Sequence, residues 1–228
     1  MPEARQAIVC YVTDRLSLGA APDSPVDPTV DETGELLAKV RLAIQAGADW
    51  VQIREKDLPG RALLDLTRDS IAGANGVARV HVNDRLDIAI AAGAAGVHLG
   101  GESLPARDVV RWCRSGNAPP QFEIGVSCHS LEDALEAERA GASYLFFGPV
   151  FDTPSKQAFG PSQGVQRLAE VCAAIRIPVI AIGGVNEENA AACIRAGASG
   201  IAAIRMFQKA QSAVALRESI AALRAPGS

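Results

Sequence analysis

The chain has 228 residues, 48% of them hydrophobic and only 4% aromatic, so Ala, Val, Ile and Leu must supply most of its core. Its formal net charge of −4, without a block of basic residues, argues against nucleic-acid binding, which needs a basic surface. Its five cysteines are widely spaced and its apolar runs are too short to span a membrane. We therefore expect a cytoplasmic protein with free thiols, no structural zinc and no membrane partner.

Short apolar runs alternate with longer amphipathic stretches along the whole chain. They predict strands at residues 7–12, 50–54, 79–82, 96–99, 122–126, 144–147, 178–182 and 200–204. They predict helices at residues 34–46, 60–74, 85–92, 106–115, 130–140, 164–175, 187–196 and 212–224. Many of the strands are apolar on both faces, as in the run from Val179 to Ile182, which is typical of a parallel sheet covered by helices.

A junction of the form Ala-Gly-Ala recurs four times, with a spacing of about 50 residues, at Gly47, Gly93, Gly141 and Gly197. In each, a glycine follows a helix-like stretch, where it can adopt the left-handed conformation that ends a helix, and a predicted strand comes next. This spacing suits two strand–helix units, so four repeats indicate eight of each. We predict an α/β protein with one (β/α)₈ barrel domain, a TIM barrel, over residues 1–228; an open doubly wound sheet is the alternative.

In such a barrel the active site lies at the carboxyl ends of the strands. Two long proline-containing loops, 14–33 and 148–163, follow the first and sixth strands and should lie on this face. The polar residues expected there, in strand order, are Thr13 and Asp14; Gln52, Arg54 and Lys56; His81, Asn83 and Asp84; His98, Glu102 and Ser103; Ser127, Cys128 and His129; Thr153, Ser155 and Lys156; Gly183 and Gly184; and Arg205.

Strand alternation places Gln52, Arg54 and Lys56 on one side of the second strand. A charge that points into a barrel has to be paired, so Arg54 either forms an ion pair with Glu55 or Asp84 or binds a substrate anion. Lys56, nearer the mouth of the barrel, is the better anion ligand.

Two further strand ends each allow two interpretations. The N–H groups of Gly183 and Gly184, together with the N-terminus of a following helix, could bind a phosphate, although glycines also form simple turns. Asp84 could bind Mg²⁺, which takes one or two carboxylates plus phosphate oxygens, or it could cap the N-terminus of the next helix.

The end of the fifth strand also has competing interpretations. His129 could be an acid–base group or could hydrogen-bond locally at the start of helix 130–140, which Ser130 is expected to cap. Cys128 next to it is not expected to pair with His129 in catalysis, because adjacent strand residues point to opposite sides.

The strand-end motifs, in the same order from about residue 7 to residue 224, resemble the thiamine phosphate synthase family and its sister group, the thiazole tautomerases. They are residues 11–15 (YVTDR), 52–56 (QIREK), 82–85 (VNDR), 96–100 (GVHLG), 125–130 (GVSCHS), 147–151 (FGPVF), 153–156 (TPSK) and 181–185 (AIGGV). The resemblance implies a Mg²⁺-dependent transferase that couples an aminopyrimidine methyl diphosphate to a thiazole phosphate and releases pyrophosphate.

The resemblance also implies roles for individual residues. Gln52 and Asn83 would contact the pyrimidine, and Asp84 would bind Mg²⁺. Phosphate groups would be held by Arg54, Lys56, Ser127 and Lys156, and the thiazole phosphate side would be lined by Thr153, Ser155 and Gly184.

The chain departs from the synthase pattern at two positions. Ser103 stands where the synthases have a second metal-binding Asp, which leaves Glu102 as a possible substitute. Arg205 stands where they have a phosphate-binding Ser, and Arg can still bind phosphate through two hydrogen bonds.

Two alternatives to a synthase therefore stay open: a thiazole tautomerase, in which His129 would be the acid–base residue, and a non-catalytic relative that binds a phosphorylated ligand. A sugar-phosphate isomerase of the same fold is a third. In each case the expected partners are phosphorylated small molecules, and the expected assembly is a monomer or a homodimer.

Overall fold

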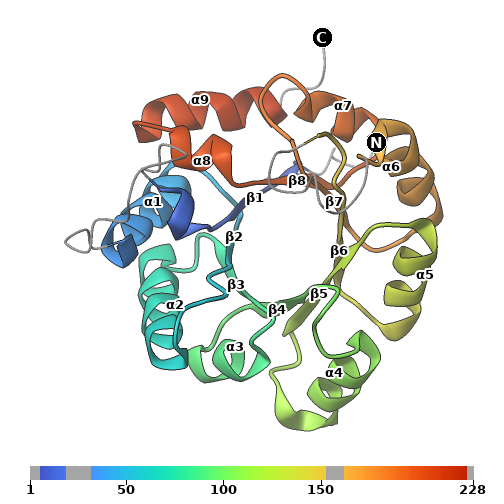
Figure 1. The fold of residues 1–228 in the computed structure, drawn as a ribbon, viewed down its shortest axis with the longest axis horizontal. Helices are drawn as coiled ribbons and strands as arrows, with labels where there is room; N and C mark the ends of the chain where they lie inside the picture. The colour runs from blue at the N-terminus through green and yellow to red at the C-terminus, as the bar shows by residue number, and fades with distance from the viewer. Residues whose placement is uncertain (1–5, 19–31, 153–161, 225–228) are drawn as a thin grey trace.

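The computed structural model describes residues 6–18, 32–152 and 162–224. Eight parallel strands form a closed barrel in which each strand pairs with its neighbours in the chain and β8 pairs with β1 (Figure 1). The predicted (β/α)₈ barrel is therefore confirmed, and an open sheet is excluded, since the pairing of β1 with β8 leaves no free edge. In the described part of the chain, no helix is long and apolar enough to cross a bilayer.

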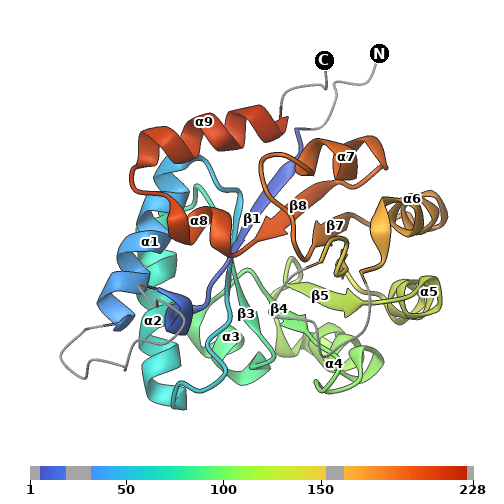
Figure 2. The same ribbon diagram turned by 45° about the horizontal axis from the view of Figure 1, so that its top comes forward.

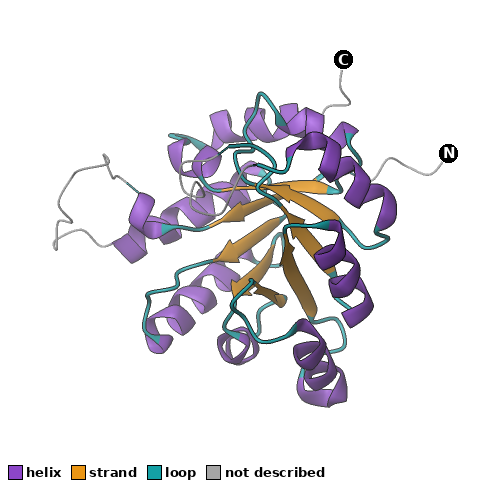
Figure 3. Ribbon diagram, turned by 45° about the vertical axis from the view of Figure 1, so that its right-hand side comes forward, coloured by secondary structure: helices purple, strands orange, loops and turns teal. Residues whose placement is uncertain are grey.

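The helices surround the barrel, with the strands at its centre (Figure 3). The strands are β1 (Ile8–Val12), β2 (Trp50–Ile53), β3 (Arg79–Asn83), β4 (Gly96–Leu99), β5 (Glu123–Cys128), β6 (Tyr144–Phe147), β7 (Val179–Ile182) and β8 (Gly200–Ala203). The helices are α1 (Glu32–Ala46), α2 (Gly60–Ala74), α3 (Leu86–Ala92), α4 (Ala106–Trp112), α5 (Leu131–Ala140), α6 (Gly164–Ala174), α7 (Ala190–Arg195), α8 (Arg205–Lys209) and α9 (Ala213–Arg224). Helix α9 lies beside α1 and closes the ring (Figure 2).

Three short elements were not expected from the sequence. A single 3₁₀ turn, η1 (Arg15–Ser17), follows β1, and α8 stands between β8 and the final helix. Helix α4 ends in a π turn, η2 (Cys113–Asn117), where Gly116 has a φ of 90° that ends the helix. These differences lie in the connections and leave the strand order unchanged.

The four Ala-Gly-Ala junctions have the same geometry. Each glycine has a left-handed φ between 73° and 104°. The alanine after it donates its N–H to a carbonyl in the last turn of the preceding helix, the bond that completes a Schellman motif. These bonds are Ala48 to Ala43 (3.0 Å), Ala94 to Ala89 (2.9 Å), Ala142 to Ala137 (3.0 Å) and Ala198 to Cys193 (3.1 Å). The repeat found in the sequence is therefore a repeated helix ending at the amino ends of the strands.

Two layers of apolar side chains hold the barrel together. The larger lies between strands and helices, and the smaller fills the barrel interior around Trp50, Tyr144 and Phe146. The Tyr144 ring crosses the interior directly over Gly125, where a Cβ would stand only 2.5 Å from its Cε2 and Oη atoms. Glycine at this position is required by packing, and the wide aromatic floor blocks the barrel below its mouth.

Candidate functional site

The site is formed by side chains that point into the mouth of the barrel from β2, β3, β4 and β5. Gln52 is 2% exposed, and its Nε2 donates to Asn83 Oδ1 at 3.0 Å. Its Oε1 is buried and has no hydrogen-bond partner among the described residues. A buried acceptor without a partner costs free energy, so this oxygen is suited to receive an N–H from a ligand.

His98 links the floor of the site to Ser127. Its Nε2 lies 2.9 Å from Ser127 Oγ on β5, and its Nδ1 lies 3.2 Å from the Tyr144 hydroxyl on β6. The His98 ring is 1% exposed and packs against Phe146, with ring centroids 4.2 Å apart. Tyr144 was not predicted as a site residue, because its phenol reaches the site only by crossing the barrel over Gly125.

A buried cluster of polar groups joins the loops after β1 and β2. Glu55 accepts hydrogen bonds from Thr13 Oγ1 (2.5 Å) and from the backbone N–H (3.1 Å) and Nη1 (3.2 Å) of Arg15. Arg15 also pairs with Asp57 and with Glu32. Burial raises the pKa of Glu55, against the opposing effect of these bonds, whereas Arg15 lowers the pKa of Asp57.

The cluster argues against one of the two interpretations of Arg54, an ion pair with Glu55 or Asp84. Adjacent residues diverge, so Glu55 turns to the other side of β2, where Arg15 meets it. The Arg54 backbone N–H instead donates to Thr13 Oγ1 at 2.9 Å. Over the described ranges, neither the half-buried Arg54 nor the exposed Lys56 forms an ion pair, so both cations are available for an anion.

Asp84 has an unusual backbone at the end of β3. Its φ is 64°, a left-handed conformation that non-glycine residues adopt at a cost and that often marks functional sites. The N-cap of α3 is Arg85, and no side chain caps that helix, so of the two interpretations of Asp84 the helix cap is wrong. The Asp84 backbone is bonded instead, its N–H to the His98 carbonyl at 2.8 Å, which leaves its carboxylate exposed at the rim.

The loop after β4 carries a single carboxylate, that of Glu102. Glu102 is exposed, and the Ser103 Oγ accepts a hydrogen bond from the Gly100 N–H at 2.8 Å. Within the described residues, no group of three or more His, Cys, Asp or Glu side chains could hold a metal ion by itself. One carboxylate fits Mg²⁺ when a substrate supplies phosphate oxygens, because Mg²⁺ commonly binds in that way.

Cys128 and His129 point apart, as alternation predicts. Cys128 is 0% exposed, and burial raises the pKa of its thiol to about 12, which excludes it as a nucleophile at neutral pH. His129 is exposed, and its Nδ1 bonds to the Gly148 carbonyl at the end of β6. The predicted cap is confirmed: Ser130 Oγ accepts from the Asp133 N–H at 3.0 Å.

Gly183 and Gly184 end β7 with φ values of 92° and 68°. A Cβ on Gly183 would lie 2.5 Å from Pro149 Cα, and one on Gly184 2.7 Å from the Asp152 carbonyl oxygen, so close packing requires both glycines. The helix predicted at residues 187–196 is present as α7, but it begins only at Ala190, three residues later than expected.

The remaining predicted site residues are Arg205, Thr153, Ser155 and Lys156. Arg205 is exposed and opens α8 just after β8, at the same end of the barrel. Thr153, Ser155 and Lys156 lie outside the described residues.

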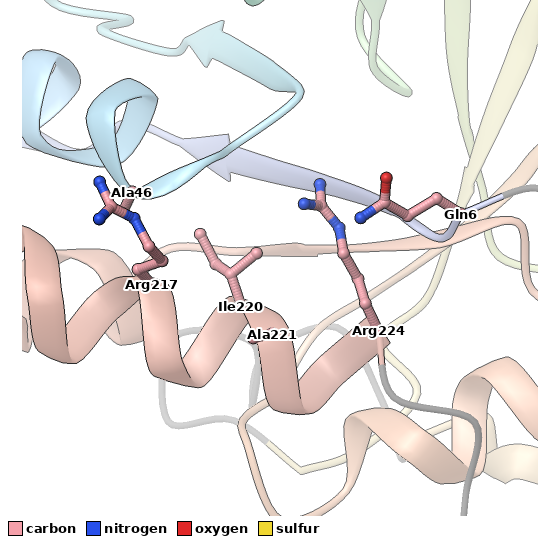
Figure 4. A pocket seen from close by; sticks show the side chains of 6 residues that line it. All are labelled: Gln6, Ala46, Arg217, Ile220, Ala221 and Arg224. Carbon is pink, nitrogen blue, oxygen red and sulfur yellow. The ribbon is translucent and has the colours of Figure 1, made fainter.

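A pocket of about 300 Å³ lies at the opposite, amino end of the strands (Figure 4). Its lining includes Arg217 and Arg224 of α9. Arg224 bonds to the Ala7 and Gly47 carbonyls and to the Asp49 carboxylate, and Arg217 bonds to the Gln45 carbonyl. These cations fasten the last helix to the barrel, so this pocket is not the candidate site.

Comparison with known proteins agrees with the geometry at the barrel mouth. A family model described as thiamine monophosphate synthase matches residues 25–207. The chain belongs to the thiamine monophosphate synthase family. The resemblance inferred from the strand-end motifs is thereby confirmed.

Named members of the family are similar over most of the chain. A thiamine-phosphate synthase of Methanoculleus marisnigri is 43% identical over 198 residues, which is 82% of this chain and 89% of that protein. One from Chlorobium luteolum is 39% identical over 205 residues, 89% of this chain and 94% of that protein. The solved thiamine phosphate pyrophosphorylase of Pyrococcus furiosus has 30% identity and a TM-score of 0.78, and the match covers 96% of each chain.

Proposed function

We propose that this chain is a thiamine-phosphate synthase, which joins hydroxymethylpyrimidine diphosphate to thiazole phosphate and releases pyrophosphate. Its family membership supports this transferase activity. The structural observation that carries the proposal is the buried Oε1 of Gln52, which has no partner among the described residues. The exocyclic amine of an aminopyrimidine is a donor that would satisfy this oxygen, while Asn83 keeps the amide oriented through its 3.0 Å bond.

The diphosphate would lie beside the pyrimidine, over the ends of β2 and β5. Arg54 and Lys56 contribute positive charge there, and the Ser127 hydroxyl can donate a hydrogen bond. We assign Lys156 to the same group from its place in the family motif. By the same reasoning we assign Thr153, Ser155, Gly183, Gly184 and Arg205 to the thiazole phosphate.

In the reaction, the bond between the pyrimidine methylene carbon and the diphosphate oxygen breaks, and a bond from the same carbon to the thiazole nitrogen forms. The electron pair of the breaking bond leaves with pyrophosphate, so the protein has to stabilise charge on the leaving group. Arg54 and Lys56 do this, and the aromatic floor of Tyr144 and Phe146 closes the barrel below the reacting atoms.

Mg²⁺ fits this site as a partner of the diphosphate. Asp84 would hold it, because its exposed carboxylate stands at the rim on a backbone whose own N–H is bonded to the His98 carbonyl. When bound, the ion would neutralise charge on the leaving pyrophosphate. Glu102 is the other carboxylate that we assign to it, since Ser103 has no charge.

The decisive experiment is a turnover assay with purified protein, Mg²⁺ and both substrates, in which thiamine phosphate and pyrophosphate are measured. We expect both products above a no-enzyme control. The variant Asp84→Asn should lose Mg²⁺-dependent activity, whereas Asp87→Asn, a matched change at an exposed Asp that pairs with Arg85, should keep it.

A folded protein that binds thiazole phosphate but forms no product would refute the proposal. It would favour a thiazole tautomerase or a ligand-binding relative, and His129→Gln would separate these two. If His129 is an acid–base residue, that change should slow proton transfer by about 10²–10⁴-fold. Since the substrates are soluble metabolites, we place the enzyme in the cytoplasm.

A further inference from the structure

We propose that His98 is a positioning residue that turns the hydrogen of the Ser127 hydroxyl toward the substrate diphosphate. This role rests on the proposed function, because it matters only if Ser127 donates a hydrogen bond to the diphosphate of the substrate. The Tyr144 hydroxyl is buried on β6, and among the described residues its only hydrogen-bond partner is His98 Nδ1, at 3.2 Å.

The Tyr144 hydroxyl has to donate to His98. Burial raises its pKa well above the usual value, so the phenol keeps its proton. If His98 Nδ1 carried a hydrogen, the Tyr144 hydrogen would be buried without an acceptor, which costs about 1–3 kcal/mol. Nδ1 is therefore the acceptor, and the ring is neutral with its hydrogen on Nε2.

That tautomer decides which way Ser127 points. His98 Nε2–H lies 2.9 Å from Ser127 Oγ and donates to it. The Ser127 hydrogen cannot then point at His98 and is available for an acceptor in the barrel mouth. In the other tautomer Ser127 would donate to Nε2 and would turn its lone pairs toward a negatively charged phosphate, so the contact would be repulsive.

The rings that fix this arrangement are held by packing. His98 lies between Phe146 and Tyr144, at centroid distances of 4.2 and 5.6 Å, and Tyr144 also packs against Trp50 at 4.7 Å. Gly125 makes room for the Tyr144 ring. The Ser127 hydroxyl is thus oriented before the substrate binds. A donor that is already oriented can stabilise the charge that develops on the leaving group without further rearrangement.

The tautomer can be measured without substrate. The chain has only three histidines, so the ¹⁵N resonances of labelled rings can be assigned with His81→Gln, His98→Gln and His129→Gln. We expect His98 to be neutral with a protonated Nε2. A protonated Nδ1 would overturn the proposal.

The effect on Ser127 can be measured with pyrophosphate and Mg²⁺ as the titrated probe. Ser127→Ala should weaken binding about tenfold, the usual effect of losing a hydrogen bond to a charged group. His98→Leu should weaken it to a similar extent, and His98→Gln, whose amide can still donate to Ser127, should recover most of the affinity. Because His98 acts through Ser127, the double variant should bind no more weakly than Ser127→Ala alone.

His81→Leu is the matched control. His81 is also a buried histidine of the barrel interior, but it bonds to Glu123, at the amino end of β5, and not to Ser127. This variant should keep its pyrophosphate affinity. Additive losses in the double variant would show that His98 acts on the fold in general and would overturn the proposal, as would a failure of the unmodified protein to bind pyrophosphate. Pyrophosphate binding with the expected tautomer but without turnover would support the role of His98 and count against the proposed reaction.

Discussion

Replacement of Gly125 in β5 by Ala should destabilise the barrel, because the added methyl group would clash with the Tyr144 ring. The new Cβ would stand 2.5 Å from Tyr144 Cε2 and Oη, and carbon atoms pack at about 3.5 Å or more, so the ring would have to retreat by about 1 Å. It has no room, because Trp50, His98 and Phe146 surround it. Overpacking of this kind costs about 1–3 kcal/mol, and loss of the bond to His98 adds about 1 kcal/mol.

A total of about 3 kcal/mol corresponds to a fall in Tm of about 10 °C for a domain of this size, which thermal unfolding followed by circular dichroism would detect. Gly101→Ala is the control, because its Cβ would meet nothing within 4 Å and its Tm should stay unchanged. In the Gly125→Ala background, Tyr144→Leu should cost less than it does alone, since it removes the clashing ring. Equal Tm values for Gly125→Ala and Gly101→Ala would refute the packing argument.

Three other properties can be tested in the same way. Arg15→Met leaves Glu55 buried without its cation and should cost about 3 kcal/mol near pH 8. Because burial raises the pKa of Glu55, the folded state binds a proton that the unfolded state has lost, so this cost should shrink as the pH falls toward 5; a Tm deficit that is constant from pH 5 to 8 would contradict this. Burial also raises the pKa of Cys128 to about 12 and that of Cys193 to about 11, so mass spectrometry after iodoacetamide treatment at pH 8 should find both unlabelled in the native protein and labelled in denaturant. Ser103→Asp, whose carboxylate can still accept the Gly100 N–H, adds a charge beside the strand that carries Asp84 and should lower the Mg²⁺ concentration needed for half-maximal activity several-fold; an unchanged value would show that position 103 does not face the ion.

The barrel could be predicted because its signals are local and repeated. Each Ala-Gly-Ala junction marks a helix end from three neighbouring residues, and each strand is a short apolar run. The start of α7 was placed too early for an equally local reason. The Asn186 side chain accepts from the Asn189 N–H at 3.2 Å and the Asn189 side chain accepts from the Asn186 N–H at 2.9 Å, a turn that competes with the helix.

The direction of the site side chains was predictable only along a single strand. Alternation correctly sends Gln52 into the barrel, but the partner of Glu55 depends on the loop after β1, which brings Arg15 alongside it. Asp84 has a left-handed backbone at the point where its N–H bonds to the His98 carbonyl on the neighbouring strand, a conformation that no local sequence pattern indicates. The features that could not be predicted, the partner of Glu55 and the backbone of Asp84, therefore depend on contacts between different strands and loops.

The four matching Schellman junctions mean that the loops at the two ends of the barrel differ in how much they can vary in sequence. At the amino end, about every fifty residues, the chain returns to the same backbone geometry through the same bond, so the joints between quarter-barrels are interchangeable in form. At the carboxyl end the loops differ in sequence, and the candidate ligands of the substrate come from several strands. The segments between successive junction glycines, each with two strands and their helices, are consequently natural units for exchange between relatives. A chimera joined at these glycines would acquire new loops over the substrates and keep the backbone geometry of the junctions.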